Sequence, residues 1–574
     1  MRLTSIEISN FRGIHHAITY FPQDTRIVCI IGSGDSGKSS LLKAIEWVLW
    51  PNWNLIATDT DFFNCDSDTP IVITASITEV PDALLTEDKF GLYLRDFKST
   101  WLGLENDEPT DNGIVILTIR LTIDSTLEPK WEVITNRTVP KPISQKDRRL
   151  LSFGVVGFDH EKDFQWGRNS ILQKYADSRG PLHSVYTQAM RNAVANTNLE
   201  SLDAMAPKLA EIGCQYGVAF NGELHNKLLM QSNSFSASVG MFDDKVPFSQ
   251  RGLGSKRLLS IGMNVSAYDS GTLVLVDEVE TGLEPYRISA LISQFRTQFK
   301  DHGQLIMTTH SRSVVCECNV NELVVANLFN GELSLHHLNM IDDIRDSIQA
   351  MIRSEPDGFL SKRIIVCEGK TEVGFLRAFD NYLAETELMR FAHFGVGIAL
   401  GGGGDKFFTL AKLFKNCGYD VCVLMDSDIE SEEKGKQEMA ALGIPVFAWE
   451  SGYAIEQQIF HDISNRVAEE LIQYAAEEKS LEHVKNKLDA FFVGTVKPYT
   501  INDDKIKLND TMTSEERTNI GKIAKQKRCE WFKRIDLGQQ VGSTICANIA
   551  ELDDASVLKR TLLALRNWVT GHEK

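Results

Sequence analysis

A glycine-rich segment that ends in lysine and serine is suited to holding the phosphates of a nucleotide. Residues 32–39, Gly-Ser-Gly-Asp-Ser-Gly-Lys-Ser, follow an apolar run and precede an apolar stretch that Pro51 ends. This is the GxxxxGK[ST] pattern between a strand and a helix, in which backbone N–H groups surround phosphate oxygens. We expect Lys38 to neutralise the β- and γ-phosphates and Ser39 to ligate Mg²⁺. The predicted nucleotide-binding residues are Gly32, Ser33, Gly34, Asp35, Ser36, Gly37, Lys38, Ser39 and Ser40.

A second phosphate-related pair of side chains lies far downstream. The apolar run at residues 273–276 ends in Asp277 and Glu278, so a buried strand delivers both carboxylates at its carboxyl end. Asp277 suits the magnesium shell, and Glu278 is placed to polarise an attacking water. By itself, an acidic strand end is more often a helix cap or a surface loop. Behind a phosphate-binding loop, the pair is typical of a Walker B motif.

A separate set of carboxylates has the order and the residue types of a site for divalent metal ions. Its members are Glu368 and Glu372, a glycine turn at residues 401–404, Asp426 and Asp428, and Glu456. Phosphodiester cleavage needs hard cations held by oxygen ligands, and two ions about 4 Å apart can activate water and stabilise the leaving oxygen. Asp426 and Asp428 project to the same side of an extended segment. For that pair alone, a solvated loop is the alternative; the ordered set favours a metal site.

The surrounding sequence predicts α/β architecture. Short, nearly continuous apolar runs followed by helical patterns recur along the chain, as in sheets covered on both faces. A polar turn at residues 355–358 is the expected boundary between a domain at 1–350 and a second at 360–574. We expect residues of about 165–245 to form a helical insertion in the first domain. The second domain is expected to end in helical additions at about 464–574.

Composition limits the class of protein. The chain has 574 residues and a net charge of −18, which argues against a general basic coating for nucleic acid but not against a local basic groove. No apolar run approaches the length of a membrane helix, and the first residues lack the apolar core of a secretory signal. The ten cysteines include no CxxC pair, so a zinc site is not expected. We predict a reduced, cytoplasmic protein without a membrane partner.

The first domain resembles the RecF/SMC-type ATPases of the ABC class. Residues 6–13, Ile-Glu-Ile-Ser-Asn-Phe-Arg-Gly, resemble the opening of that family, and residues 252–257, which include Gly254 and Ser255, resemble a divergent signature motif. The resemblance implies that Gly254 and Ser255 contact ATP bound to a second protomer. It also gives His310 the role of a switch histidine that senses the γ-phosphate. A homodimer or a higher homo-oligomer with composite nucleotide sites is therefore expected.

The order of the carboxylates in the second domain is similar to that of a Toprim domain. An ABC-type ATPase followed by a Toprim domain resembles the OLD (overcoming lysogenization defect) family of ATP-dependent nucleases. The chain departs from the family at Val279, where proline is usual, at Glu284, where histidine is usual, and at Gly34 and Asp35 in the phosphate loop. The family also uses a lysine near the C-terminus. Lys533 is the predicted match, with Lys522 as the second choice, and a merely basic surface helix is the alternative.

The densest basic stretch of the chain follows the proposed metal site. It consists of Arg517, Lys522, Lys525, Lys527, Arg528, Lys533 and Arg534. Trp531 and Phe532 lie within it and would offer surfaces for bases or sugars. A charge run is usually a solvated face, but its position in the chain favours contact with nucleic acid phosphates. No base-reading module is recognisable.

Together these features predict an ATP-regulated, divalent-metal-dependent DNA endonuclease or nickase. Its expected catalytic residues are Glu278, His310, Glu368, Asp426, Asp428 and Lys533, and its expected metal ligands are Ser39, Asp277, Glu368, Glu372, Asp426, Asp428 and Glu456. ATP and Mg²⁺ or Mn²⁺ are the expected cofactors, with two ions in the Toprim site. The resemblance implies a role in anti-phage defence, alone or with a helicase or a retron, and a dimerisation element in the insertion.

Other functions remain open on the sequence. A RecF-like repair ATPase would bind DNA without cutting it, although a binding module has no reason to gather metal ligands. A topoisomerase-like or primase-like activity is a third possibility. A topoisomerase would also need a positioned nucleophilic tyrosine. ABC transport fits least, because a second active site is fused to the ATPase.

Overall fold

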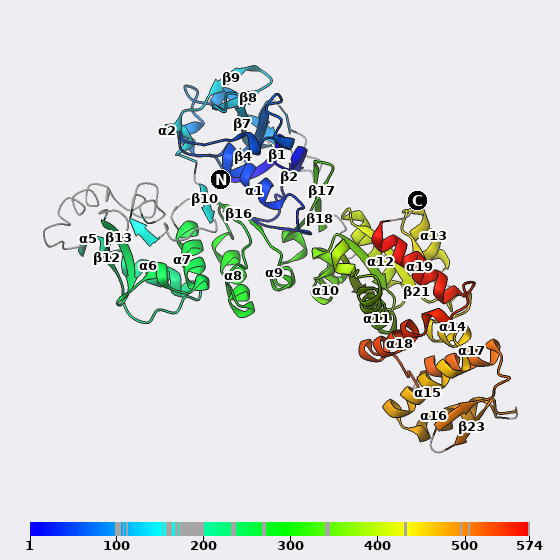
Figure 1. Ribbon diagram of the computed structural model, residues 1–574. Helices are drawn as coiled ribbons and strands as arrows, with labels where there is room; N and C mark the ends of the chain where they lie inside the picture. Colours follow the sequence, from blue (N-terminus) through cyan, green and yellow to red (C-terminus); the bar gives the residue numbers. More distant parts are fainter. Residues whose placement is uncertain are drawn as a thin grey trace. The chain divides into compact units, whose positions relative to one another are not determined.

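The chain forms two compact units, Met1–Arg353 and Ser354–Lys574, in a computed structural model (Figure 1). The structure describes residues 1–97, 105–106, 108–110, 113–151, 153–156, 164–166, 172, 200–230, 237–266, 271–338, 345–429, 433–493, 496–502, 505–527 and 529–571. The division between the units falls beside the polar turn at residues 355–358. No helix in the described ranges is both long enough and apolar enough to cross a lipid bilayer.

The phosphate-binding loop extends from a parallel region of one large mixed sheet in the first unit. The parallel strands run in the order β10 (Phe153–Val156), β15 (Leu273–Val276), β16 (Gln304–Thr308), β3 (Ile27–Ile31) and β17 (Leu323–Phe329). Every residue of β3, β15 and β16 is buried, as the apolar runs predicted for strands covered on both faces. The adjacent helices are α1 (Lys38–Val48), α7 (Leu253–Ser266), α8 (Pro285–Gln298) and α9 (Arg312–Glu317).

The same sheet continues as a mainly antiparallel region beyond β17. Its strands are β18 (Glu332–His337), β2 (Ile14–Tyr20), β1 (Arg2–Phe11), β4 (Ile71–Thr78), β7 (Ile114–Ile123), β5 (Arg95–Phe97), β6 (Glu105–Asn106), β8 (Pro129–Thr135) and β9 (Thr138–Pro142). Two further helices, α2 (Gln145–Arg148) and α10 (Arg345–Ser354), belong to this unit. The two regions share one apolar core, in which Leu41 and Ile45 of α1 pack among residues of both.

The expectation of a helical insertion at about 165–245 is wrong for its second half. Helices α5 (Glu200–Asp203) and α6 (Ala206–Gln215) are present, but residues before and after them form a small sheet. It consists of β11 (Gln165–Trp166), β12 (Leu224–Met230), β13 (Ala237–Asp243) and β14 (Val246–Pro247). β12 and β13, which are neighbouring segments of the chain, pair antiparallel from Leu224↔Asp243 to Met230↔Ala237, so cross-strand pairing overrides the weak helical pattern. Residues 173–199, inside the expected insertion, lie outside the described residues.

The second unit is built on a four-stranded parallel sheet. Its strand order is β20 (Val396–Leu400), β19 (Arg363–Cys367), β21 (Asp420–Met425) and β22 (Val446–Ala448). The helices α11 (Lys370–Thr386), α12 (Lys406–Asn416), α13 (Glu433–Ala441) and α14 (Ile455–Asp462) connect or follow these strands. Because parallel strands share one carboxyl edge, Glu368 after β19 and Asp426 after β21 emerge side by side.

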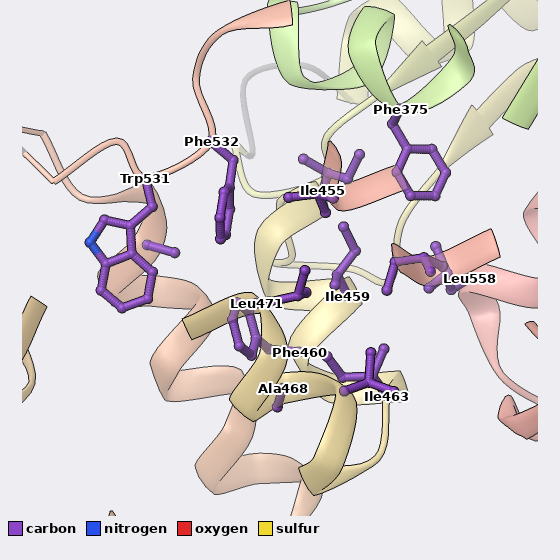
Figure 2. Packing of buried hydrophobic residues seen from close by; sticks show 14 of the residues in the cluster. Phe375, Ile455, Ile459, Phe460, Ile463, Ala468, Leu471, Trp531, Phe532 and Leu558 are labelled. Carbon is purple, nitrogen blue, oxygen red and sulfur yellow. The ribbon is translucent and has the colours of Figure 1, made fainter. Parts of the chain in front are cut away.

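The C-terminal part of the second unit is mostly helical, as expected, with one hairpin that the sequence analysis did not predict. Its helices are α15 (Asn465–Lys479), α16 (Leu481–Phe491), α17 (Ser514–Lys525), α18 (Ile535–Ala547) and α19 (Val557–Thr570), and its hairpin is β23 (Tyr499–Asn502) with β24 (Lys505–Leu508). Figure 2 shows how Phe460 of α14, Leu471 of α15 and Phe532 meet in one apolar cluster. This packing fixes α14 and α17 against the Toprim-like sheet.

Candidate functional site

The loop after β3 has the geometry of a phosphate-binding loop. Gly32 has φ 140°, and a Cβ there would lie 2.6 Å from the carbonyl oxygen of Ala326, so only glycine fits. Lys38 Nζ donates to the carbonyl oxygens of Gly32 and Ser33 at 3.1 and 2.6 Å and to Ser36 Oγ at 2.9 Å. The loop thus curls around the ammonium group at the start of α1, where phosphate oxygens would be received.

Burial affects the charge of this lysine. Desolvation lowers the pKa of Lys38 to about 8, against the opposing effect of the Asp277 carboxylate. A bound polyphosphate would supply the negative charge that the site lacks, and would therefore raise this pKa again.

Oxygen atoms suited to Mg²⁺ come together beside the loop. Ser39 Oγ donates to Asp277 Oδ1 at 3.2 Å, and Thr308 Oγ1 donates to the same oxygen at 2.5 Å. The Glu278 backbone N–H binds Thr308 Oγ1 at 2.8 Å, and Glu278 has φ 45°. The predicted pair Ser39 and Asp277 is therefore in contact, although 238 residues separate them. Thr308, which the sequence analysis missed, orients both members of the Asp277-Glu278 pair.

His310 follows β16, the strand that lies between β3 and β15. Desolvation and the charge of Lys38 lower the pKa of His310, so its neutral form is favoured near Lys38. The structure thus brings His310 into the electrostatic environment of Lys38, Asp277 and Glu278. A neutral imidazole there is able to donate one hydrogen bond to a phosphate oxygen.

The signature-like residues occupy the start of α7. Gly254 is buried, and a Cβ at this position would lie 2.4 Å from the carbonyl oxygen of Gly282. Ser255 is half-buried beside it. Within the chain, Gly254 therefore packs on the turn after Walker B, and its contact with a second protomer's nucleotide stays a prediction. The buried Arg257 of α7 donates to the carbonyl oxygens of Asp277 and Glu278, a support that the sequence did not reveal.

The carboxylate cluster of the second unit forms at the carboxyl edge of its sheet. Glu368 Oε2 accepts the backbone N–H of Asp426 at 3.0 Å, and Asp426 Oδ1 accepts the N–H of Ile455 at 2.9 Å. Glu372 on α11 and Glu456 on α14 are both buried. The predicted members Glu368, Glu372, Asp426, Asp428 and Glu456 all line one cavity of about 550 Å³.

Mutual repulsion and burial perturb these acids. Desolvation, followed by the charge of Glu456, raises the pKa of Glu372 to about 8. Desolvation also raises the pKa of Asp426, Glu456 and Glu368. Buried carboxylates that repel one another are costly unless a cation compensates them.

The lysine closest to the cluster is Lys525 on α17. Its Nζ donates to Asp428 Oδ2 and lies 3.9 Å from Asp426 Oδ2. Although burial opposes the effect, the Asp428 hydrogen bond and the Asp426 charge raise the pKa of Lys525. Gly521 lets α17 approach α14, because a Cβ there would lie 2.6 Å from the carbonyl oxygen of Glu456.

The lysines named from the sequence take other positions. Lys533 lines the same cavity, but its half-exposed side chain is paired with Glu530 at 3.6 Å. Lys522 is exposed and bonded to Asn519. Lys525 was missed as a site lysine because its approach to Asp428 depends on helix packing that no local pattern encodes.

The residue types of the cluster fit a hard divalent cation, since every donor is a carboxylate oxygen. Within the described ranges, no three acidic, histidine or cysteine side chains are already spaced to hold one metal ion. The ammonium group of Lys525 supplies the positive charge beside Asp426 and Asp428. Metal binding would therefore require the carboxylates to rearrange toward the ion.

The residues of the basic stretch are divided between core and surface. The expectation that Trp531 and Phe532 offer surfaces for bases or sugars is wrong. Trp531 and Phe532 are 0% and 1% exposed and pack in the core, as Figure 2 shows. Arg517 is turned inward and donates to the carbonyl oxygens of Phe460 and Met512. Lys522, Lys527, Lys533 and Arg534 remain exposed, and Arg528 lies outside the described residues.

Comparisons with known proteins find separate family matches within the two units. Residues 359–428 match the family described as "Overcoming lysogenization defect protein-like, TOPRIM domain". Residues 1–90 match "AAA ATPase domain", and residues 135–317 match "AAA domain, putative AbiEii toxin, Type IV TA system". The chain is thus similar to OLD-family proteins, with matches to ATPase domains followed by a match to an OLD-like Toprim domain.

The chain is 22% identical over 485 residues to the Old nuclease of Escherichia phage P2. The match covers 75% of this chain and 78% of that relative. Solved structures similar to it include an Smc head bound to the C-winged helix domain of ScpA, with 13% identity and a TM-score of 0.39. Another is the Smc head domain with an extended coiled coil bound to the C-terminal domain of ScpA from Pyrococcus furiosus, with 14% identity and a TM-score of 0.38. Each match covers 60% of this chain and 99% of the other.

Proposed function

We propose that this protein is an ATP-regulated, divalent-metal-dependent DNA endonuclease or nickase. The observation that carries the proposal is the carboxylate cluster at the carboxyl edge of the four-stranded sheet in the second unit. Glu372, Asp426 and Glu456 are all at least nine-tenths buried and come from three different elements. A module that only bound DNA would gain nothing from buried, mutually repelling acids. This argues against the RecF-like repair ATPase without nuclease activity.

The residues that would hold metal ions are Glu368, Glu372, Asp426, Asp428 and Glu456. Bound divalent ions would supply an activated water and a Lewis acid for the leaving oxygen. The protein's own contribution is to position the acids: Asp426 is anchored by the Ile455 N–H, while its own N–H holds the Glu368 carboxylate beside it. The raised pKa values mean that metal binding displaces protons from the cluster.

Lys525 is the residue that we assign to stabilising developing negative charge at the scissile phosphate. It lines the cavity, and its charge is held there by Asp428. When metal ions satisfy the carboxylates, the ammonium group becomes available to a phosphate oxygen. Lys533, at the rim of the same cavity, is suited to contact a neighbouring phosphate.

The first unit would bind ATP at residues 32–39 and hydrolyse it with Glu278 and His310 in the roles expected from the sequence. Its signature residues Gly254 and Ser255 would complete the site of a second protomer, which makes a homodimer part of the proposal. ATP binding would then set the dimer geometry and regulate access of DNA to the Toprim site. The same resemblance supports a role in anti-phage defence, with or without a partner protein.

The decisive experiment compares cleavage of supercoiled and linear DNA with Mg²⁺ or Mn²⁺, with and without ATP. Asp426→Ala should abolish cleavage and keep ATP hydrolysis, whereas Lys38→Ala should lose nucleotide binding. Asp420→Asn is the matched control, because Asp420 starts the same strand β21 but is exposed and paired with Arg363. Full cleavage by Asp426→Ala would contradict the nuclease assignment. Relaxed, religated circles would instead favour a topoisomerase.

A further inference from the structure

The carboxylate of Glu280 connects the turn after Walker B to the loop that carries His310. Glu280 Oε2 accepts the hydroxyl of Thr309 at 2.7 Å, and Glu280 Oε1 accepts the backbone N–H of His310 at 2.7 Å. Both carboxylate oxygens are therefore engaged by consecutive residues that follow β16. Charge-assisted hydrogen bonds of this kind are about twice as strong as neutral ones.

The two hydrogen bonds of Glu280 to Thr309 and His310, which we call the Glu280 bridge, connect the segments that carry Glu278 and His310, the two groups required for the proposed ATP hydrolysis. Glu280 is two residues from Glu278, and its partner is the backbone of His310. A second contact holds the same strand ends together, since the Val279 N–H donates to the carbonyl oxygen of Thr308 at 3.1 Å. The separation between Glu278 and His310 thus depends on Glu280, on this backbone hydrogen bond and on the contacts of Thr308 Oγ1 with Asp277 and the Glu278 N–H.

The bridge also continues toward the signature helix. The Leu283 N–H donates to the carbonyl oxygen of Glu280 at 2.9 Å, which closes the turn that contains Gly282. Gly282 packs so closely on α7 that a Cβ would lie 2.7 Å from Leu253 Cγ. A displacement of the start of α7 would therefore reach the His310 loop through this turn.

In the part of the chain that the structure describes, the Glu280 carboxylate accepts hydrogen bonds from Thr309 and His310 and none from the phosphate-binding loop, where its charge only adds to that of Asp277 near Lys38. The partners of Lys38 are Gly32, Ser33 and Ser36, and the partner of Ser39 is Asp277. Loss of the Glu280 carboxylate would leave these contacts in place. Its effect should therefore fall on turnover and not on nucleotide affinity.

We propose that Glu280 is a positioning residue for ATP hydrolysis, which holds His310 and Glu278 in register on either side of the γ-phosphate and couples both to the signature helix. The inference rests on the proposed ATPase function. It assigns Glu280 no contact with ATP and no proton transfer.

The test measures ATP turnover and the affinity for a fluorescent ATP analogue in the full chain. Glu280→Ala should lower kcat by about tenfold or more, because an anchor of the switch loop is lost, with KM and analogue affinity within about twofold of the unmodified protein. Glu280→Gln should recover part of kcat, since its amide oxygen still accepts the His310 N–H. Glu284→Ala is the matched control: Glu284 lies in the same segment, is 54% exposed and contacts Arg287 instead.

A double-mutant cycle separates this role from general support of the fold. On a His310→Ala background, Glu280→Ala should cost less than about twofold further, because it acts through His310. If the two substitutions lowered kcat independently, so that the fold-losses of the single variants multiplied in the double variant, the proposal would be overturned. An unchanged kcat in Glu280→Ala would also overturn it.

A milder variant keeps the test valid if Glu280→Ala fails to fold. Thr309→Val preserves side-chain shape and removes one arm of the bridge, so it should lower kcat and leave analogue affinity unchanged; normal turnover would overturn the proposal. Absence of ATP hydrolysis in the unmodified protein would contradict the proposed ATPase itself. That result is distinct from normal hydrolysis in Glu280→Ala.

Discussion

The ammonium group of Lys525 binds the carboxylate of Asp428, a residue 97 positions earlier in the chain. Asp426 is also close, at 3.9 Å from the same nitrogen. The contact joins the last residue of α17 to the loop after β21. A lysine from the C-terminal helices thereby lines the same cavity as the five carboxylates at the carboxyl edge of the sheet.

Replacing this lysine should abolish DNA cleavage without unfolding the second unit. We expect Lys525→Ala to lower the rate of nicking by about a hundredfold or more, the cost typical of losing one preorganised charge or donor in an active site. Lys522→Ala is the control, because Lys522 lies on the same helix, is exposed and binds Asn519. Normal cleavage by Lys525→Ala, with loss in Lys533→Ala, would return the role to Lys533.

The buried acids predict an unusual dependence of stability on pH. The pKa of Glu372 is raised from 4.5 to about 8, so the folded protein keeps a proton that the unfolded chain has lost. The stabilisation of the folded protein that comes from this retained proton is complete below the pKa of Glu372 in the unfolded chain. It is lost as pH rises through the pKa of Glu372 in the folded protein. Between those values the free energy of unfolding should fall as pH rises, by up to about 1.4 kcal/mol per pH unit for one proton.

Denaturant titrations of the metal-free protein at pH 6 and pH 8 would measure this slope. Glu372→Gln should flatten it, whereas Glu385→Gln, an exposed position on the same helix, should leave it unchanged. Added Mg²⁺ should stabilise the protein most at the higher pH, where ligands are deprotonated. A slope that Glu372→Gln does not alter would contradict the burial of that charge.

Arg517 should be required for stability and not for DNA binding. Its guanidinium donates to Asn465 Oδ1 at 2.7 Å, to Ser514 Oγ at 3.0 Å and to carbonyl oxygens at the end of α14. We expect Arg517→Ala to lower the free energy of unfolding by about 2 kcal/mol, since several partly buried acceptors lose their donor. Lys527→Ala, at an exposed position, should weaken DNA binding and leave unfolding unchanged. Weaker DNA binding by a fully stable Arg517→Ala would argue for a direct phosphate contact.

Close packing of α11 on α18 should make glycine necessary at their crossing. A Cβ at Gly538 would lie 2.6 Å from the carbonyl oxygen of Thr371, the neighbour of Glu372. Gly538→Ala should therefore cost about 1–3 kcal/mol through overpacking and should reduce cleavage by moving α11. Denaturation and nicking assays would check both effects. Ser543→Ala, exposed on the same helix, should change neither.

Local motifs allowed much of the chemistry to be predicted from the sequence. The phosphate loop, the Asp277-Glu278 pair and the ordered carboxylates each depend on short segments at strand ends, where residue type and position are coupled. Placement of Glu368 beside Asp426 followed from the shared edge of parallel strands.

Features that depend on distant packing could not be predicted in this way. Lys525 reaches Asp428 only because Gly521 lets two helices touch, and the basic stretch gave no sign that Trp531 is core. The strands at 224–243 are stabilised by each other and not by their own pattern. Arg257 and Glu280 act through backbone groups, which leave no signature in residue types.

The position of α17 late in the chain has a consequence during synthesis. The acids of the Toprim site are translated first, while Lys525 and the helix that packs Gly521 against α14 emerge only afterwards. Domains generally fold as units during synthesis, which proceeds at about 5–20 residues per second. A nascent chain that has made Asp426 and Glu456 therefore holds an incomplete site. An unfinished copy of the chain would therefore lack the lysine that we propose for DNA cleavage.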